Sequence, residues 1–427
     1  MSITPHQAQK TEEVINLVNN GYKRITLTGE AGVGKTFVSK ELTKHFLEQF
    51  KSLKTSKWAA EAIYITAPTN KALSILQSKI ASHPNNIFKT THSALKMNRI
   101  VDDNQDRVYF KPITSDKNPA FDGCVLAIVD ECSMLETKIV NMLDDFKFPI
   151  IFVGDSEQLP PVGEVVSPVF NRNYPNVKLE EIVRQGEGNP IITLSRNLEL
   201  IRKRESHVLD GGYGYVFQND KTRIIENLAA VNGTDDLKYL AFTNTEVNSM
   251  NKRVRERLYG NNPAKIELKE TLVMDAPKGE HWTNKEIKVQ DLKIITEKIR
   301  IPTSRSKFTY NGPTNCDTIK MRVYRINDDF NIVHEQSQQM YNIALSTIIN
   351  NCEKLNWSWK CKYFFVEQFA QTKYNHAITI HKSQGSTYQE AVLNVGTVNT
   401  VRNPSIRKKM LYTGVTRAAK LLVLNNA

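Results

Sequence analysis

Three short apolar runs, each ending at glycine or acidic residues, set the pattern of the first half of the chain. They comprise residues 25–28, 125–129 and 150–153. Unbroken apolar runs of this length are typical of parallel strands that are buried on both faces. After the first run and a glycine-rich segment, residues 37–50 have helical periodicity. The pattern predicts an α/β fold with parallel sheets and functional residues at the carboxyl ends of the strands.

The glycine-rich segment at residues 29–36 reads GEAGVGKT, which matches a phosphate-binding loop. Glycines let the backbone turn tightly and aim its N–H groups at phosphate oxygens, and the following helix adds its positive end. A chance glycine-rich turn is the alternative, but the strand before it and the helix after it favour the loop. The predicted nucleotide ligands are Gly29, Glu30, Ala31, Gly32, Val33, Gly34, Lys35 and Thr36.

Polar residues also follow the second and third apolar runs, where a hydrolysing enzyme needs them. Asp130 and Glu131 follow the second run, and Gln158 lies shortly after the third. We expect ATP and Mg²⁺, with Lys35 on the β and γ phosphates and with Thr36 and Asp130 as metal ligands. Glu131 is the predicted general base, and Gln158 is predicted to sense the γ-phosphate.

Charge and composition narrow the partner and the compartment. Lys and Arg number 57 against 45 Asp and Glu, and the net charge of +12 favours a polyanionic partner without identifying one. The five cysteines lack C-x-x-C spacing, so we expect reduced structural thiols. No apolar run is long enough to span a bilayer, and the N-terminus lacks a secretory signal. We therefore expect a cytoplasmic protein, in the host cytoplasm if a phage encodes it.

With these motifs in this order, the chain resembles superfamily 1 helicases, and specifically the RecD-like branch that includes the phage Dda helicases. Further segments that carry the resemblance are ITPHQ at 3–7, APTNKA at 67–72, TTHS at 90–93, LEEIVRQ at 179–185, AITIHKSQGST at 377–387 and YTGVTRA at 412–418. The resemblance implies that Gln7 reads the adenine edge. It also implies that Arg184 and Arg417 are arginine fingers that meet ATP when the second motor domain closes on the first.

The resemblance further implies a strand-binding surface divided between the two motor domains. Its predicted DNA contacts suit phosphate and sugar rather than base edges. His92 and His381 could equally be ordinary core or surface histidines. The predicted DNA-binding residues are Pro68, Thr69, Asn70, Thr91, His92, Thr379, His381, Lys382, Ser383 and Gln384.

The predicted domain organisation has two RecA-like motor domains with two insertions. Residues 1–175 form the first domain, which a hairpin insertion at 97–122 interrupts. Residues 176–259 and 366–427 form the second, and residues 260–365 form a β-rich insertion that by resemblance is an SH3-like barrel. The hairpin aromatics Tyr109 and Phe110 either pack the hairpin onto the first domain or separate strands, and both interpretations stay open.

These observations predict a monomeric ATP-driven translocase on single-stranded DNA that unwinds forked or tailed duplex DNA in replication, recombination or repair. Single-strand-binding or replisome proteins are candidate partners. The direction of movement, 5′ to 3′, is implied by the resemblance alone. The alternatives are a P-loop ATPase that remodels protein or nucleoprotein complexes, an RNA helicase, and a nucleic-acid-binding module with a vestigial ATP site.

Overall fold

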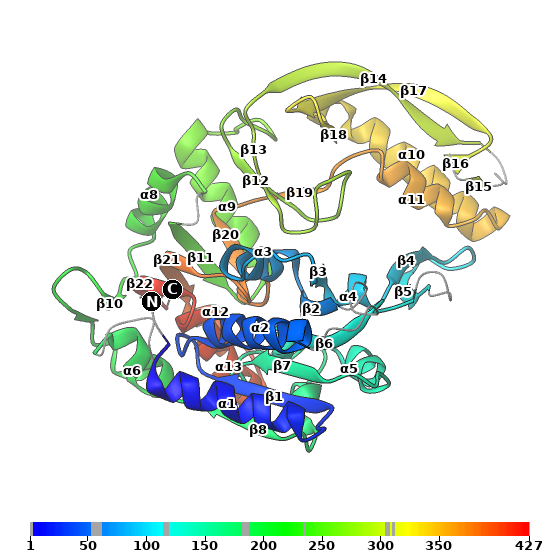
Figure 1. The fold of residues 1–427 in the computed structure, drawn as a ribbon. Coiled ribbons are helices and arrows are strands. Elements are labelled where there is room, and N and C mark those ends of the chain that lie inside the picture. Colours follow the sequence, from blue (N-terminus) through cyan, green and yellow to red (C-terminus); the bar gives the residue numbers. More distant parts are fainter. Residues whose placement is uncertain are drawn as a thin grey trace.

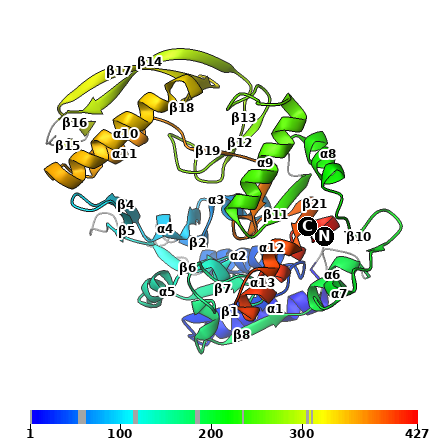
Figure 2. The same cartoon turned by 180° about the vertical axis from the view of Figure 1, so that it is seen from behind.

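The computed structural model describes residues 3–52, 62–113, 119–181, 188–233, 236–303, 308–309 and 312–426. Two sheets with helices on both faces form two lobes, and a long insertion arches above them (Figure 1, Figure 2). The predicted α/β class with parallel sheets is thus confirmed. Within the described ranges, we find no helix that combines the length and the apolar character needed to cross a membrane.

The first lobe contains a six-stranded parallel sheet in the order β3-β2-β6-β7-β1-β8. The predicted strands are three of its four inner strands, and their apolar side chains fill the core. Their carboxyl ends meet at one edge, where the phosphate loop and the acidic pair follow. The strands are β1 (Arg24–Gly29), β2 (Ala62–Ala67), β3 (Asn86–Thr90), β6 (Cys124–Val129), β7 (Ile150–Gly154) and β8 (Asn176–Leu179).

Helices cover both faces of this sheet. Val14, Leu42 and Leu76 pack against one face, while Ile139 and Leu143 pack against the other. Helices α1 (Pro5–Asn19), α2 (Lys35–Ser52) and α3 (Asn70–Lys79) cover the first face. The second is covered by α4 (Thr91–Ala94), η2 (Cys132–Met134), α5 (Thr137–Asp144) and η3 (Pro168–Asn171).

The second lobe has a six-stranded sheet in the order β20-β11-β21-β22-β10-β9, in which only the edge strand β9 is antiparallel. Its strands are β9 (His207–Val208), β10 (Gly214–Phe217), β11 (Leu237–Ala241), β20 (Ala377–Thr379), β21 (Tyr388–Asn394) and β22 (Ala418–Asn425). Helices α8 (Lys221–Val231) and α9 (Asn244–Tyr259) cover one face. The other face carries α6 (Pro190–Arg196), α7 (Leu200–Lys203), α12 (Val395–Asn399) and α13 (Pro404–Val415), and the turn η4 (His381–Ser383) follows β20.

The predicted boundary between the lobes at residue 175 was wrong, because β8 pairs with β1 and so belongs to the first sheet. Val177 and Leu179 of β8 are buried, whereas Asn176 and Lys178 are exposed. Such alternation is typical of an edge strand and differs from the unbroken apolar runs of the central strands. The first lobe therefore extends through Leu179.

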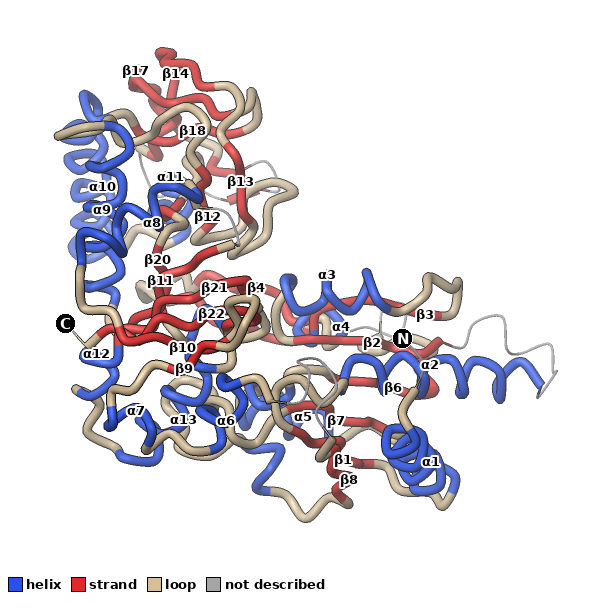
Figure 3. Tube along the Cα trace, turned by 90° about the vertical axis from the view of Figure 1, so that its left-hand side faces the viewer, coloured by secondary structure: helices blue, strands red, loops and turns tan. Residues whose placement is uncertain are grey.

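The insertion combines small antiparallel sheets with two helices, and it rises above the second lobe when seen from the side (Figure 3). Two three-stranded sheets share a core that includes Leu272 and Ile326. They contain β12 (Thr271–Met274), β13 (Glu286–Lys288) and β19 (Thr372–Tyr374), and β14 (Leu292–Pro302), β17 (Cys316–Ile326) and β18 (Phe330–Val333). A short pair, β15 (Phe308–Thr309) and β16 (Gly312–Pro313), and helices α10 (Glu335–Leu355) and α11 (Lys360–Val366) complete it.

Two predictions about the insertion need correction. Its end at residue 365 was wrong, because β19 pairs with β12 and the second sheet resumes only at β20. The predicted β-rich content also omitted α10, a helix of 21 residues. Only Ser337, Ile348 and Cys352 of α10 are buried. The sequence of this helix therefore has little of the apolar periodicity from which a helix is predicted. The aromatic residues Trp359 and Phe365 lie in the core.

A hairpin of the first lobe reaches the insertion. It consists of β4 (Met97–Val101) and β5 (Val108–Pro112), paired antiparallel from Met97 with Pro112 to Val101 with Val108. At its tip, Asp103 pairs with Lys360 at 2.7 Å, and Asp106 pairs with Lys362 at 2.6 Å. The tip of the hairpin is thus attached to α11 (Figure 1).

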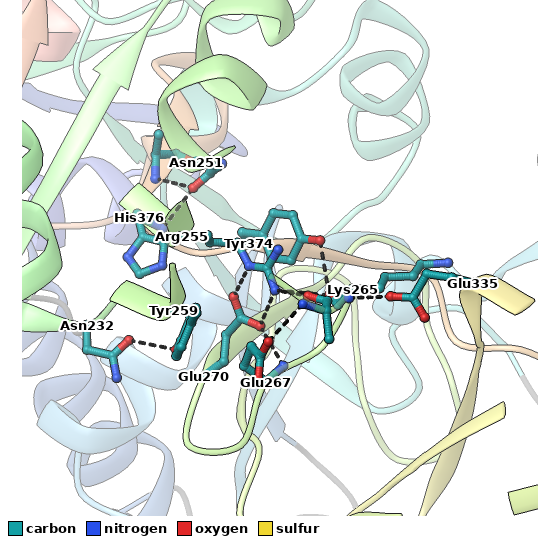
Figure 4. Close-up of polar contacts among 12 residues, drawn as sticks. Asn232, Asn251, Arg255, Tyr259, Lys265, Glu267, Glu270, Glu335, Tyr374 and His376 are labelled. Carbon is teal, nitrogen blue, oxygen red and sulfur yellow. Dashed lines mark hydrogen bonds and ion pairs between the residues drawn. The ribbon is translucent and has the colours of Figure 1, made fainter. Parts of the chain in front are cut away.

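The insertion is fastened to the second lobe by a buried ion pair (Figure 4). Arg255 of α9 donates from Nε to Glu270 at 2.5 Å, and its guanidinium carbon lies 4.0 Å from the centre of the Tyr374 ring. Both side chains of the pair are almost fully buried. Lys265 then contacts α10 through Glu335 and donates to the Val333 carbonyl at 3.0 Å. The contacts join α9, the first segment of the insertion and the start of α10.

We expect Arg255→Ala to lower the free energy of unfolding by about 3–5 kcal/mol, because it leaves Glu270 charged, buried and without its partner. The double variant Arg255→Met with Glu270→Leu should lose less, since it removes both charges and keeps the volume. Denaturant unfolding of the three proteins measures this. An equal loss in the single and double variants would contradict the assignment of the cost to an unpaired charge.

Candidate nucleotide site and nucleic-acid interface

The phosphate loop connects β1 to α2 in the conformation that its glycines require. Gly32 and Gly34 have φ of +92° and +86°, in the left-handed region that other residues disfavour. The Lys35 ammonium donates to the carbonyls of Gly29 at 2.7 Å and Glu30 at 2.9 Å, and it therefore lies across the mouth of the loop. Because α2 begins at Lys35, its free N–H groups face the same space.

Gln7 packs against the phosphate loop and forms a hydrogen bond to its backbone. Its side chain is buried, and its amide nitrogen donates to the Val33 carbonyl at 3.1 Å. Its amide oxygen accepts from the N–H of Thr4, which completes the capping box of α1. A side chain at Gly34 would collide with this amide, since an added Cβ would lie 2.3 Å from Gln7 Nε2. Gln7 thus explains the third glycine, while adenine recognition by Gln7 stays a prediction.

The acidic pair after β6 has the features of a cation site. Asp130 is buried and accepts at 2.9 Å from the backbone N–H of Glu131, whose φ is +50°. Burial, reinforced by the neighbouring Glu131, raises the pKa of Asp130 to about 7. Glu131 Oε2 is buried and has no hydrogen-bond partner in the described part of the chain. A bound divalent cation would offset the cost of burying the Asp130 charge and of leaving Glu131 Oε2 without a partner. These oxygens, with the Thr36 hydroxyl in the first turn of α2, therefore fit Mg²⁺.

One tyrosine of the second lobe reaches the phosphate loop, and sequence reasoning missed it. The Tyr412 hydroxyl of α13 donates to Asp155 Oδ2 at 2.7 Å and accepts from the N–H of Ala31 at 3.3 Å. Beside it, Arg196 of α6 pairs with Glu30 of the loop at 2.8 Å. Tyr412 opens the YTGVTRA motif, but nothing in that motif shows which loop its hydroxyl meets.

The second lobe also grips the loop that follows β7. Thr413 accepts from the N–H of Leu159 at 3.2 Å, and Gln384 donates to the Leu159 carbonyl at 3.0 Å. Lys409 donates to the Ser156 carbonyl at 2.6 Å. Between these contacts lies Gln158, whose buried Oε1 has no partner among the described residues. The predicted γ-phosphate sensor therefore lies in a loop whose backbone the other lobe holds.

The two predicted arginine fingers have different outcomes. Arg184 lies outside the described residues. Arg417 is buried and donates to the carbonyls of Thr413 at 3.0 Å and Ser386 at 3.0 Å, with a longer contact to Ser383 at 3.4 Å. Its guanidinium therefore braces segments of its own lobe in this conformation, and its role as a finger stays a prediction.

A cavity of about 300 Å³ brings predicted strand contacts of both lobes together. Thr69 comes from the first lobe, where its hydroxyl caps α3 by accepting from Ala72 N at 3.2 Å. His381, Lys382 and Gln384 come from the turn after β20 in the second lobe. The wall is completed by Lys71, Met134, Glu136, Pro160, Pro161, Val162, Thr283, Asn284 and Ser386.

Other predicted strand contacts do not line this cavity. Thr91 and Ser383 are fully buried, and the Ser383 hydroxyl donates to Ile380 O at 2.7 Å, so both side chains contact the protein core in this conformation, and their contacts to a strand stay predictions. Thr379 is also buried, below the turn. Pro68 and Asn70 are half-buried beside Thr69.

His92 lies at the base of the hairpin rather than in the cavity. Its ring centre is 5.8 Å from that of Phe110, in an edge-to-face arrangement, and burial lowers the pKa of His92. Tyr109 and Phe110 remain exposed on β5. The contact with His92 is compatible with packing of the hairpin, and the exposed ring surface is compatible with strand separation.

Comparison with known proteins agrees with this division into two lobes. Residues 12–164 match a family model described as an AAA domain, and residues 374–425 match a UvrD-like helicase C-terminal domain. The protein is an ATP-hydrolysing helicase. Together with the relatives described below, these matches support the placement of the chain among superfamily 1 helicases of the UvrD-like and Pif1-like type.

Relatives that match most of this chain are distant in sequence. An uncharacterized protein of Acanthamoeba polyphaga mimivirus is 26% identical over 97% of both chains. The RecBCD enzyme subunit RecD of Buchnera aphidicola is 24% identical over 98% of this chain and 72% of its own. The ATP-dependent DNA helicase Pif1 of Campylobacter jejuni is 24% identical over 93% and 87%. Among solved structures, a Bacteroides Pif1 helicase in complex with ADP-AlF3 and ssDNA shares the fold, with a TM-score of 0.53, 18% identity and coverage of 100% and 93%.

We expect Tyr412→Phe to lower the kcat of ATP hydrolysis roughly tenfold while the KM for ATP changes less. The ring stays in place, but Oδ2 of the buried Asp155 carboxylate loses the hydroxyl donor and keeps only the Glu157 N–H at Oδ1, which costs about 1–3 kcal/mol. Steady-state hydrolysis measures this. Tyr259→Phe is the matched control, because its hydroxyl donates to Asn232 within the second lobe. A Tyr412→Phe protein with the wild-type kcat would show that the hydroxyl bridge is dispensable.

Proposed function

We propose that the helicase is a translocase on single-stranded DNA that unwinds duplex DNA in the 5′ to 3′ direction. The observation that carries this proposal is the cavity lined by Thr69 of one lobe and by His381, Lys382 and Gln384 of the other. A strand held there touches both lobes at once. A change in their separation would then shift one contact surface relative to the other, which is what translocation requires.

Hydrolysis would take place at the edge of the first sheet. Lys35 would neutralise the β and γ phosphates, and Glu131 would accept a proton from the attacking water. Mg²⁺ held by Thr36 and Asp130 would stabilise negative charge on the phosphates. Gln158, with its free buried oxygen, would contact the γ-phosphate region and so distinguish ATP from ADP.

The loop after β7 would couple the two sites. Its first part contacts Tyr412 at the phosphate loop, and its last part, Pro160 to Val162, lines the strand cavity. Gln384 belongs to both regions, because it donates to the Leu159 carbonyl and lines the same cavity. A displacement at the nucleotide would therefore reach the strand through a few directly bonded residues.

The finer family placement is also part of the proposal. The sequence motifs resemble the RecD-like branch and its phage Dda members, and the relatives that include a RecD subunit support this. We propose that the two small sheets of the insertion form its SH3-like barrel, and that the β4–β5 hairpin is the separating element. Roles in replication, recombination or repair and a monomeric state are proposed from the same resemblance, and a cytoplasmic location is proposed from the sequence features given above.

The proposal predicts that single-stranded DNA strongly stimulates ATP hydrolysis and that a duplex with a 5′ single-stranded tail is unwound while one with a 3′ tail is not. Steady-state ATPase and strand-displacement assays measure both. Lys35→Ala should abolish both activities because it removes the phosphate contact. A variant without residues 100–108 should keep the stimulated ATPase and lose unwinding.

Other outcomes point to the alternatives. Stimulation by RNA alone would indicate an RNA helicase, and ATPase that is indifferent to nucleic acid would indicate a protein remodeller. Unwinding only from a 3′ tail would contradict the proposed direction. An equal loss of ATPase and unwinding in the hairpin variant would contradict its role in strand separation.

The proposed arginine finger makes a separate prediction. Arg417→Ala should lower kcat about a thousandfold while nucleotide binding falls little, because a finger acts mainly in the transition state. Fluorescent-nucleotide binding and single-turnover hydrolysis measure the two effects. Arg417→Lys keeps the charge without the planar fork and tests whether the guanidinium itself is needed. Near-normal turnover in Arg417→Ala would leave only the bracing role seen here.

A further inference from the structure

A second cavity lies in the second lobe on the face covered by α7 and α13, and neither the nucleotide nor the strand contacts use it. Its volume is about 520 Å³. The helices α6, α7 and α13 lie below the second sheet, whereas the insertion rises above it (Figure 3). The residues that line this cavity differ entirely from those of the strand cavity.

The rim of this second cavity is positively charged. Four of its lining residues are cationic, namely Arg202, Arg204, Arg407 and Lys408, and Glu199 is the one acidic residue among them. Glu199 pairs with Arg202 at 2.9 Å. The other three cations have no ion-pair partner in the described part of the chain. Such uncompensated charge attracts an anionic ligand.

Apolar side chains line part of the cavity, which we call its apolar floor, and they limit the kind of anion. Leu198, Ile201, Phe217 and Leu411 contribute to it. A nucleic-acid backbone is held mainly by phosphate contacts on open basic surfaces and does not need a concave apolar floor. Concave apolar sites with a few charged groups are instead typical of ligands that bury an apolar group. A peptide with carboxylates beside an apolar side chain matches both the cationic residues and the apolar residues of the cavity.

The cavity is built on one stripe of α13. Pro404, Arg407, Lys408 and Leu411 follow the spacing of a single helix face. Tyr412 and Thr413 face the loop after β7 instead, so the nucleotide contacts and the cavity use different faces of this helix. The charged stripe is therefore free of the contacts that the motor requires.

We propose that this cavity, which we call the α7–α13 cavity, is a docking site for an acidic peptide segment of a partner protein. The carboxylates would pair with Arg204, Arg407 and Lys408, and an adjacent apolar side chain would enter between Phe217 and Leu411. Charge complementarity and the apolar floor carry the proposal. It goes beyond the proposed helicase function and does not depend on the direction of movement.

Fluorescence polarisation with a short fluorescein-labelled peptide of aspartates ending in phenylalanine tests this proposal on the full chain without nucleotide. Saturable binding is expected. The double variant Arg204→Glu with Arg407→Glu should weaken it at least about tenfold, since each reversal replaces an attractive pair by a repulsive one. Lys203→Glu is the control for the reversal at Arg204, the residue that follows α7: it makes the same single change of charge at the neighbouring position, but Lys203 is exposed and does not line the cavity.

Two further probes decide between occupants. A peptide with serine in place of phenylalanine should bind at least about tenfold more weakly, because it leaves the apolar floor unfilled. Both charge variants should keep the circular dichroism spectrum and the single-strand-stimulated ATPase of the wild type. Equal weakening by Lys203→Glu, equal binding of the serine peptide, or displacement of the labelled peptide from the wild type by oligothymidylate would overturn the proposal.

Discussion

The hydroxyl of Tyr412 occupies the point on which the rest of the motor depends, because it bonds the phosphate loop and the loop after β7 at the same time. The first lobe contains Lys35, Asp130 and Glu131, and its helix α3 brings Thr69 and Lys71 to the strand cavity beside the turn after β20. Near the nucleotide, side chains of α6, of α13 and of the segment after β20 join the two lobes. Separation of the lobes would break several of these bonds together, so the cleft has reason to open and close cooperatively.

A motor also needs domains that stay rigid when the cleft between its lobes opens and closes. The Arg255–Glu270 pair supplies such rigidity at the base of the insertion, since a buried pair that loses its geometry pays a large desolvation cost. At the other end, the attachment of Asp103 and Asp106 to α11 is solvent-exposed and correspondingly weaker. The insertion is thus fixed to the second lobe by a buried pair, and to the hairpin of the first lobe by a group of more exposed contacts that also includes Arg99 with Glu367 at 2.6 Å.

The extent to which the sequence predicted this arrangement depended on how local each feature is. The phosphate loop and the acidic pair are contiguous motifs at the ends of apolar strands, and the structure has them at one edge of one sheet. By contrast, β8 is a short alternating strand whose partner β1 lies far away in the chain, so its membership could not be read locally. The burial of Ser383 could not be predicted locally either, because a serine within a motif can contact the nucleic-acid strand or stabilise the fold.

The two faces of α13 place a thermodynamic constraint on anything that binds behind the motor. Tyr412 contacts the loop after β7, and Leu411 lines the α7–α13 cavity. Because both residues belong to one helix, movement of α13 alters the contacts of the loop and the shape of the cavity together. A ligand of the α7–α13 cavity that prefers one position of α13 must bind more tightly in the nucleotide state that favours that position. By reciprocity, the same ligand must change the affinity for nucleotide by the same factor. A ligand without such a preference would instead attach a partner to the helicase and leave the ATPase cycle unchanged.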